Sequence, residues 1–252
     1  MSAAAVSLFA EPLTDSIQRD GYAVIRGAVS QESIDSMIGR VGWLCDRITQ
    51  SRWSSPYSSS LGQHLARTPR TRELLDRQVR VPRWLHSFAL QPGIVDSMHD
   101  LLGPQVQMLR HVELDIAPPQ APDPRAIWHQ DHFYVRNCAS SLMAWIPLQD
   151  TSLREGLLQV MPGSHRLGAL PHNNVVNGDQ HYPDDIFDRA VRMIPVRRGD
   201  LVIMTNHLVQ AQGPNLSPAT RWVVRARFVP KGSKVDSRHA DLVNVDGLER
   251  VQ

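Results

Sequence analysis

The spacing of apolar residues changes at about residue 105, and this change constrains the fold more than any other feature. Before it, apolar residues recur at three- and four-residue steps. The clearest case is the segment 32–48, where one stripe comprises Ile34, Met37, Ile38, Val41, Leu44 and Cys45. After it come short runs rich in β-branched residues, separated by Pro, Gly, Asn and Asp. Helices followed by several short strands predict an α+β chain with a mainly β core, a sandwich or barrel.

The individual elements follow from the same patterns. We expect a first helix capped by Thr14-Asp15 and stopped by Gly21, a strand at 22–26, and helical segments at 72–80 and 94–103. Two stretches lack any period and predict loops at 51–64 and 170–188, which we expect to line a substrate pocket. The expected strands lie within 105–117, 141–150, 156–164, 199–212 and 220–230.

Composition limits the class of protein. A chain of 252 residues, 42% hydrophobic and 21% charged, predicts one globular domain over 1–252: a helical part at 1–104, a β core at 105–230 and a tail at 231–252. A formal net charge of +2, without a run of like charges, argues against nucleic acid as a partner. No apolar run approaches the roughly 18 residues of a membrane span.

The compartment is predicted from the cysteines and the N-terminus. Cys45 and Cys138 are far apart and form no CxxC pair, which fits buried free thiols in a reducing compartment. The N-terminal residues lack the basic and apolar regions of a signal peptide. We therefore expect a cytoplasmic protein with no membrane partner; the oligomeric state, a homodimer included, stays open.

The segment WHQDHFY at 128–134 carries the most chemical information. Residues two apart in a strand project to the same side, so His129 and Asp131 would point together, with Gln130 and His132 on the other side. An imidazole beside a carboxylate supplies two corners of the facial triad that non-haem Fe(II) oxygenases use. An HxD pair is also common by chance, so the surrounding motifs have to decide between the two.

Those motifs occur in a fixed order: DGYAVIRGAVS at 20–30, WHQDHFY, AWIPLQDTSLREGLLQVMPGSHRLG at 144–168, and RRGDLVIMTN with GPNLSPATR near the end. Together, over residues 12–230, they resemble the phytanoyl-CoA dioxygenase family of Fe(II)- and 2-oxoglutarate-dependent oxygenases. The resemblance implies a double-stranded β-helix, a jelly-roll-like pair of sheets buttressed by N-terminal helices. It also implies iron ligands at His129 and Asp131, with 2-oxoglutarate and O2 as cosubstrates.

Further residues take roles from the same resemblance. Arg221 would bind the distal carboxylate of 2-oxoglutarate, which suits a guanidinium fork; a surface arginine on an edge strand is the alternative. Trp145 would line the cosubstrate site, or be a plain core aromatic. Ser217 is assigned to the cosubstrate site, and with Asn215 would brace the turn before Arg221. Gly163 and His165 would shape the wall of the site.

The third metal corner departs from the family pattern. Family members carry a histidine eleven residues after the Gly of the GD pair, five before the Asn and eleven before the Arg. Counting from Gly199, Asn215 and Arg221 gives Gln210 each time, while His207 falls on the opposite face of a regular strand. A neutral amide oxygen can coordinate iron, but more weakly than imidazole. Gln210 is then a weak natural ligand, an engineered silencing change, or a sign that the fold no longer oxidises.

The resemblance implies hydroxylation of a C–H bond in a small organic metabolite, with succinate and CO2 as co-products. Desaturation, ring closure and epimerisation share the early steps. Halogenating relatives replace the carboxylate with a small residue, so Asp131 argues against halogenation. Two alternatives remain: a non-oxidative ligand-binding protein or metal-free isomerase or cyclase using His129, Asp131 or His207 as acid or base, and a structural subunit with a vestigial site.

Overall fold

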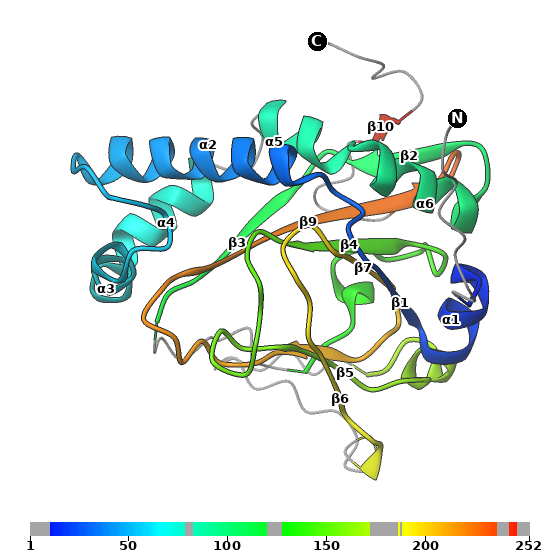
Figure 1. Ribbon diagram of the computed structural model, residues 1–252. Coiled ribbons are helices and arrows are strands. Elements are labelled where there is room, and N and C mark those ends of the chain that lie inside the picture. Colours follow the sequence, from blue (N-terminus) through cyan, green and yellow to red (C-terminus); the bar gives the residue numbers. More distant parts are fainter. Residues whose placement is uncertain are drawn as a thin grey trace, which may run out of the picture.

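Two facing antiparallel sheets form the core of the protein, with helices packed on the outer side of the larger one (Figure 1). The computed structural model describes residues 11–78, 83–119, 128–171, 186, 188–235 and 242–245. The larger sheet has the strand order β1 (Tyr22–Ile25), β7 (Leu201–Thr205), β4 (Leu142–Pro147), β9 (Arg221–Pro230), β2 (Val106–Leu109) and β10 (Leu242–Asn244), with β3 (Glu113–Ala117) also paired to β9. The smaller sheet has the order β6 (Arg192–Ile194), β5 (Leu158–Val160) and β8 (Gln210–Gln212). This is the jelly-roll-like α+β arrangement that the sequence predicts.

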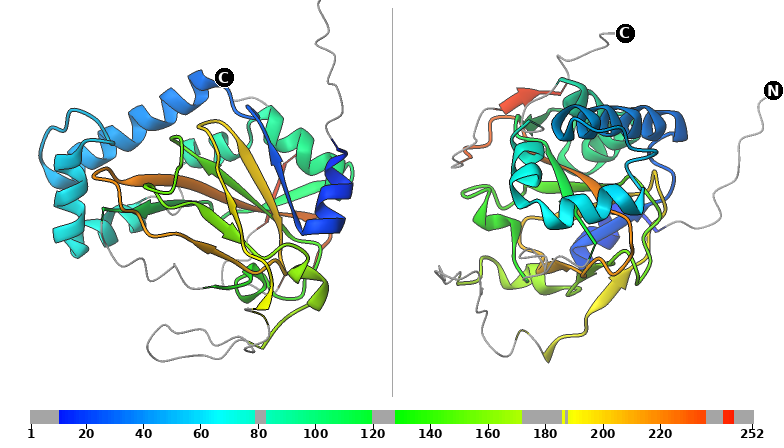
Figure 2. Two further views of the ribbon diagram at one scale, coloured as in Figure 1. Left: turned by 60° about the horizontal axis from the view of Figure 1, so that its bottom comes forward. Right: turned by 90° about the vertical axis from the view of Figure 1, so that its left-hand side faces the viewer.

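The α-helices of the described residues lie between Leu13 and Leu102. They are α1 (Leu13–Asp20), α2 (Gln31–Thr49), α3 (Ser59–Arg67), α4 (Pro69–Gln78), α5 (Arg83–Ala89) and α6 (Pro92–Leu102). The apolar stripe of α2 is buried at Ile34, Met37, Val41, Leu44 and Cys45, as its spacing predicts. Figure 2 shows α2 to α6 gathered on one side of the larger sheet. No helix in the described part of the chain has the length and apolar character needed to cross a membrane.

Strand alternation divides the apolar residues of the larger sheet between two cores. On β9, Trp222, Val224, Ala226 and Phe228 pack under the helices. Val223 faces the other way and packs with Trp145 and with residues of the smaller sheet. We call the side of the larger sheet that faces the smaller sheet its inner face. Because side chains alternate along a strand, the odd-numbered residues of β9 all project from the inner face.

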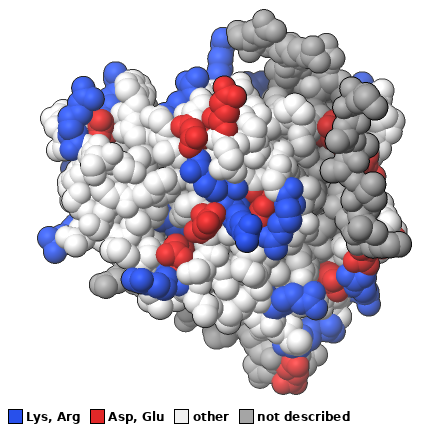
Figure 3. All heavy atoms as spheres, viewed as in Figure 1, with Lys and Arg blue, Asp and Glu red and all other residues white. Residues whose placement is uncertain are grey.

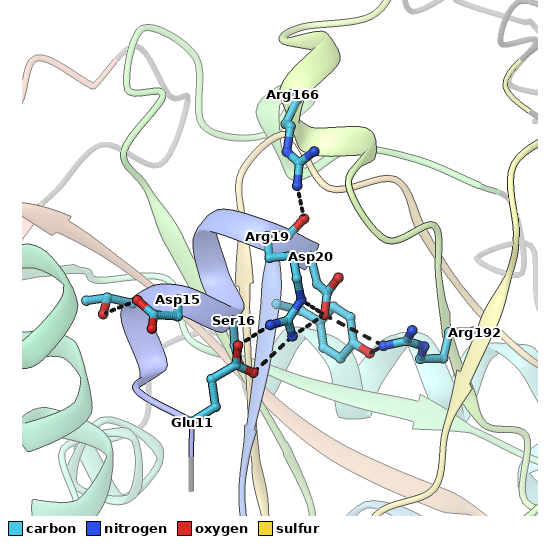
Figure 4. Close-up of polar contacts among 9 residues, drawn as sticks. Glu11, Asp15, Ser16, Arg19, Asp20, Arg166 and Arg192 are labelled. Carbon is cyan, nitrogen blue, oxygen red and sulfur yellow. Dashed lines mark hydrogen bonds and ion pairs between the residues drawn. The ribbon is translucent and has the colours of Figure 1, made fainter.

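Helix α1 links the two sheets at one end of the molecule. Its Arg19 forms ion pairs with Glu11 and Asp20, and the main-chain oxygen of Arg19 accepts a hydrogen bond from Arg166 (Figure 4). Arg192, on β6, donates to the hydroxyl of Tyr22 over 2.9 Å. Helix α1 and strand β1 are therefore held to the smaller sheet and to the turn that follows β5.

Local departures from the expected elements have simple causes. Helix α1 begins at Leu13, after Pro12 and without a side-chain cap, so the expected Thr14-Asp15 cap was wrong; Gly21 ends the helix in the left-handed region as expected. The expected loop 51–64 was wrong from Ser59 onward, because the Ser58 hydroxyl accepts a hydrogen bond from the main-chain N–H of Leu61 and starts α3.

The rest of that loop lies on the helical side of the larger sheet. The Tyr57 hydroxyl donates to the main-chain oxygen of Leu148, and Trp222 Nε1 donates to the main-chain oxygen of Pro56 over 3.1 Å. That this segment lines the substrate site stays a prediction. The second expected pocket loop, 170–188, falls mostly outside the described residues.

The distribution of charged side chains on the surface agrees with the low net charge of the chain. On the face shown in Figure 3, basic and acidic side chains are interspersed and form no continuous field of one sign. Both cysteines, Cys45 and Cys138, are free and buried, as expected.

Candidate metal and cosubstrate site

His129 and Gln210 face each other between the sheets. Their main chains exchange both hydrogen bonds, N–H to carbonyl, at 2.9 Å in each direction. On its other side Gln210 is the cross-strand partner of Val160, which belongs to the core on the inner face. Directly opposed residues project to the same face, so His129 and Gln210 both point between the sheets. Position 210 therefore lies opposite His129.

His207 lies elsewhere. It sits in the turn before β8, and its ring packs on the ring of His132 with 4.9 Å between centroids. Its main-chain oxygen accepts a hydrogen bond from Gln130 Nε2 over 2.6 Å, which holds Gln130 away from the inner face. The spacings from Gly199, Asn215 and Arg221 selected residue 210 and not His207, and the structure likewise places residue 210, not His207, opposite His129.

Asp131 begins a short 3-10 helix, η1 (Asp131–Phe133), where an ordinary strand was expected. The side chain is 2% exposed, and its Oδ2 accepts a hydrogen bond from Arg227 Nε over 2.7 Å. Its other oxygen, Oδ1, is buried and has no hydrogen-bond partner among the described residues. A buried carboxylate oxygen without a donor is costly, so Oδ1 indicates a place for a ligand.

Asp131 is the end of a buried chain of charges. Arg227 also bonds Glu113 Oε1 through Nη1 over 3.1 Å, and Arg225 Nη2 lies 2.7 Å from Glu113 Oε2. Burial alone would raise the pKa of Glu113, but the two arginines outweigh it and hold this pKa well below its usual range. Burial alone would lower the pKa of Arg227, but Asp131 and Glu113 raise it instead. Glu113 and Arg227 are therefore both charged at neutral pH.

Arg221 is buried, so the alternative of a surface arginine on an edge strand was wrong. Its Nη1 donates to the main-chain oxygens of Glu155, Gly156 and Gly213 at 2.6–3.0 Å, and its Nη2 donates to Gln212 Oε1. Gly156 has a φ of +84°, and a Cβ there would lie 2.5 Å from Arg221 Nη1. A residue with a side chain at 156 would therefore displace the guanidinium.

Gln212 connects Arg221 to the carboxylate of Asp115. Its Nε2 donates to Asp115 Oδ2 over 2.6 Å, and all three side chains are buried. The amide oxygen of Gln212 thus occupies the kind of position at Arg221 that a carboxylate oxygen of a bound diacid would take.

The other residues expected at the cosubstrate site divide into two groups. Trp145 lies on the inner face as the cross-strand partner of Arg225. It is fully buried, and its Nε1 has no hydrogen-bond partner in the part of the chain that the structure describes. Ser217 instead donates to Asn215 Oδ1 over 2.8 Å, while Asn215 Nδ2 donates to the main-chain oxygens of Ala117 and Ala219. The expected bracing of this turn by Asn215 and Ser217 is present.

Two expected wall residues serve the fold instead. Gly163 adopts the left-handed region and its N–H donates to the main-chain oxygen of Asp20; His165 Nε2 lies 3.2 Å from the main-chain oxygen of Gln18. Both therefore contact α1, and their place in the wall of the site stays a prediction.

The donor types of His129, Asp131 and Gln210 suit an iron ion, but the amide oxygen of Gln210 is a weaker ligand than the imidazole of the family pattern. His129 offers an imidazole, Asp131 offers Oδ1, and Gln210 offers an amide oxygen, the donor types that a facial triad with one substitution would have. Within the described residues no three His, Cys, Asp or Glu side chains form a metal-binding group, since the third position is an amide. Arg221 Nη2 donates to Gln212 Oε1, so a carboxylate bound at Nη2 would have to replace this amide oxygen.

Paired sheets with an HxD segment facing the partner strand, and a buried arginine on the last long strand, define the double-stranded β-helix of the Fe(II)/2-oxoglutarate oxygenases. The non-haem monooxygenase ThoJ superposes with a TM-score of 0.68 at 18% identity, covering 92% of this chain and 83% of that one. The epimerase SnoN, solved with Fe3+, α-ketoglutarate and nogalamycin RO, superposes with a TM-score of 0.63 at 18% identity, covering 86% and 82%. Both likenesses show the fold.

The sequence family is more specific. The family model for phytanoyl-CoA dioxygenase (PhyH) matches residues 17–223, and the chain belongs to this family. A probable phytanoyl-CoA dioxygenase of Caenorhabditis elegans is 24% identical over 233 residues, which cover 84% of this chain and 72% of that protein. The peroxisomal phytanoyl-CoA dioxygenase of Homo sapiens is 26% identical over 157 residues, which cover 57% of this chain and 45% of that protein.

Proposed function

We propose that this chain is an Fe(II)/2-oxoglutarate-dependent dioxygenase that hydroxylates a C–H bond of a small organic metabolite, with succinate and CO2 as co-products. The observation that carries the proposal is the pair His129 and Gln210, facing each other between the sheets near a buried Asp131 whose Oδ1 lacks a partner. Membership of the family supports it.

Each residue has a defined task in this proposal. His129, Asp131 and Gln210 hold the metal, while Arg221 holds the distal carboxylate of 2-oxoglutarate in place of the Gln212 amide oxygen. Trp145 closes the inner face, and its unpartnered Nε1 can donate to the bound diacid. When bound, iron supplies the oxidative decarboxylation of 2-oxoglutarate by O2 and the oxidation of the substrate. The chain contributes orientation and exclusion of water.

The type of oxidation is the finer part of the proposal. Proteins of the same fold include an epimerase, SnoN, and a carbocyclase, SnoK, and a sequence relative in Stutzerimonas stutzeri is a probable hypophosphite dioxygenase. Hydroxylation is the simplest outcome and is the one proposed.

The buried free cysteines fit a reducing compartment, and we propose a cytoplasmic location. We also propose a single domain, and a homodimer stays a prediction.

One set of contacts favours a second candidate, a non-oxidative ligand-binding protein or metal-free isomerase or cyclase. Asp131 is already paired with Arg227, and Arg221 with Gln212, so the ionised groups are matched without a metal. His129 and Asp131 would then act as acid and base or as ligand contacts.

Anaerobic titration with Fe(II) and 2-oxoglutarate separates the two candidates. The oxygenase proposal predicts a visible charge-transfer band at one iron per chain, and succinate formation from a panel of small metabolites once O2 is admitted. The second candidate predicts no band at millimolar iron and turnover or ligand binding that persists in excess chelator. Gln210→His, assayed side by side, serves as the matched positive control.

A further inference from the structure

The inner face of β9 carries two arginines that no iron site requires. Arg225 and Arg227 are 8% and 3% exposed, and they share Glu113, while Arg227 alone reaches Asp131. Two guanidinium groups and two carboxylates sum to zero charge. This interior is thus balanced in the absence of any metal.

Arg227 is fixed on three sides. Its Nε binds Asp131 over 2.7 Å, its Nη1 binds Glu113 over 3.1 Å, and its guanidinium lies 5.3 Å from the ring centroid of Tyr134. The same Tyr134 ring meets His129 edge-on, with 6.2 Å between centroids. Arg227 therefore contacts Asp131 directly, and the ring of Tyr134 lies between Arg227 and His129.

The hydrogen bond of Arg227 divides the two oxygens of Asp131. Oδ2 accepts the hydrogen bond from Nε, and Oδ1 is buried with no partner within the described ranges. A buried ion pair needs close and well-directed hydrogen bonds, and Arg227 Nε supplies one to Asp131 while leaving the second oxygen available. Lysine could supply the charge but not the fixed fork that reaches two acids.

We propose that Arg227 is the resident counter-cation of Asp131: it stabilises the metal-free site, presents Oδ1 to the metal, and weakens metal binding unless an anionic cosubstrate binds too. The inference rests on the proposed function. A divalent ion at Oδ1 would lie close to the guanidinium, and like charges repel strongly inside a protein. The two negative charges of 2-oxoglutarate offset the two positive charges of the metal, so the pair enters a site that stays neutral.

Equilibrium binding of Mn2+, followed by the EPR signal of the free ion, tests this on the full chain with and without 2-oxoglutarate. The variants are Arg227→Gln, which keeps a donor and removes the charge, and Arg227→Lys, which keeps the charge. We expect Arg227→Gln to bind Mn2+ alone at least about tenfold more tightly than the unchanged protein. The reason is that the variant no longer places a positive guanidinium close to the metal, and repulsion between close like charges inside a protein is large enough to change affinity by that factor. We also expect 2-oxoglutarate to increase the Mn2+ affinity of Arg227→Gln by a smaller factor than it increases the Mn2+ affinity of the unchanged protein.

Thermal unfolding supplies a second readout. Without metal, Arg227→Gln should unfold at a lower temperature, and Mn2+ should raise its unfolding temperature more than that of the unchanged protein. Arg227→Lys should keep weak binding of Mn2+ alone and its dependence on 2-oxoglutarate. Arg225→Gln is the matched control. It also breaks a buried pair with Glu113, but Arg225 interacts with Asp131 only through longer-range electrostatics, so this variant should lower stability with a smaller effect on Mn2+ affinity.

The outcomes distinguish this inference from the proposed function. A loss of stability in Arg227→Gln with unchanged Mn2+ affinity would mean a structural role only and would overturn the inference. If Arg227→Gln does not fold, Arg227→Lys decides: tight binding of Mn2+ alone by that variant overturns it as well. Absence of Mn2+ binding in every variant, Gln210→His included, contradicts the proposed function and with it the inference.

Discussion

Arg227 and Asp131 form a buried hydrogen-bonded ion pair, Nε to Oδ2 at 2.7 Å, between strand β9 and the helix η1. The two residues are 96 positions apart in the chain, so the pair fixes η1 against the larger sheet. It also sets which oxygen of Asp131 remains available between the sheets.

Removing the carboxylate of Asp131 should be costly for stability. Asp131→Ala leaves a buried guanidinium that has lost one of its two acidic partners, and breaking a buried pair in this way costs about 3–5 kcal/mol. The free energy of unfolding, measured in urea without added metal, checks this. Asp96→Ala, an exposed position on α6, should change it by no more than about 0.5 kcal/mol. A loss below about 1 kcal/mol for Asp131→Ala, as for a surface pair, would show that the ion pair contributes little.

Restoring the histidine at position 210 should strengthen the metal site. Gln210→His replaces an amide oxygen with an imidazole, and we expect Mn2+ affinity to rise by about tenfold or more, since even a lost supporting partner of a metal ligand costs 10–100-fold. His207→Gln is the control and should leave affinity unchanged, because His207 packs on His132 away from His129. A large loss of affinity in His207→Gln would mean that His207, and not residue 210, faces the metal.

Gln212 should limit the affinity for 2-oxoglutarate. In Gln212→Ser the Nη2 group of Arg221 no longer donates to an amide oxygen, so a diacid carboxylate can bind there without displacing it. We expect tighter binding of 2-oxoglutarate by calorimetry in the presence of Mn2+. Gln107→Ser, whose amide bonds Asn244 on another part of the sheet, should have no effect. Weaker binding in Gln212→Ser would instead make Gln212 a direct contact of the diacid.

Three half-buried histidines should make the protein less stable in mild acid. Burial lowers the pKa of His132, His165 and His207, and the two neighbouring histidines lower that of His207 further. Their pKa values are below the ordinary value of about 6.5, so the unfolded chain binds more protons around and below that pH. The free energy of unfolding should therefore fall as the pH is lowered from 7.5 to 5.5. His207→Gln should flatten this dependence; an unchanged slope would assign it to other groups.

The placement of residue 210 opposite His129 could be predicted because it depends on local spacing. The offsets from Gly199, Asn215 and Arg221 all run along one continuous segment, and they selected Gln210, which the β8 pairing places opposite His129. The burial of α2 followed from its own periodicity for the same reason.

The ion pairs around Asp131 could not be predicted in the same way. Alternation within RWVVRAR does place Arg221, Arg225 and Arg227 on one face, and alternation within ELD does the same for Glu113 and Asp115. Choosing the inner face over solvent requires the pairing of β3 with β9, a contact between segments about a hundred residues apart. The turn into η1 at Asp131 likewise depends on tertiary contacts, since the sequence of this segment reads as a strand.

Anomalous diffraction from crystals soaked with Mn2+ and 2-oxoglutarate tests the central claim most directly. We predict one strong peak between the sheets, bonded to a ring nitrogen of His129, to Oδ1 of Asp131 and to the side-chain oxygen of Gln210, with the Asp131–Arg227 hydrogen bond retained. A peak on the His132 and His207 rings, or no peak between the sheets at saturating Mn2+, would contradict it.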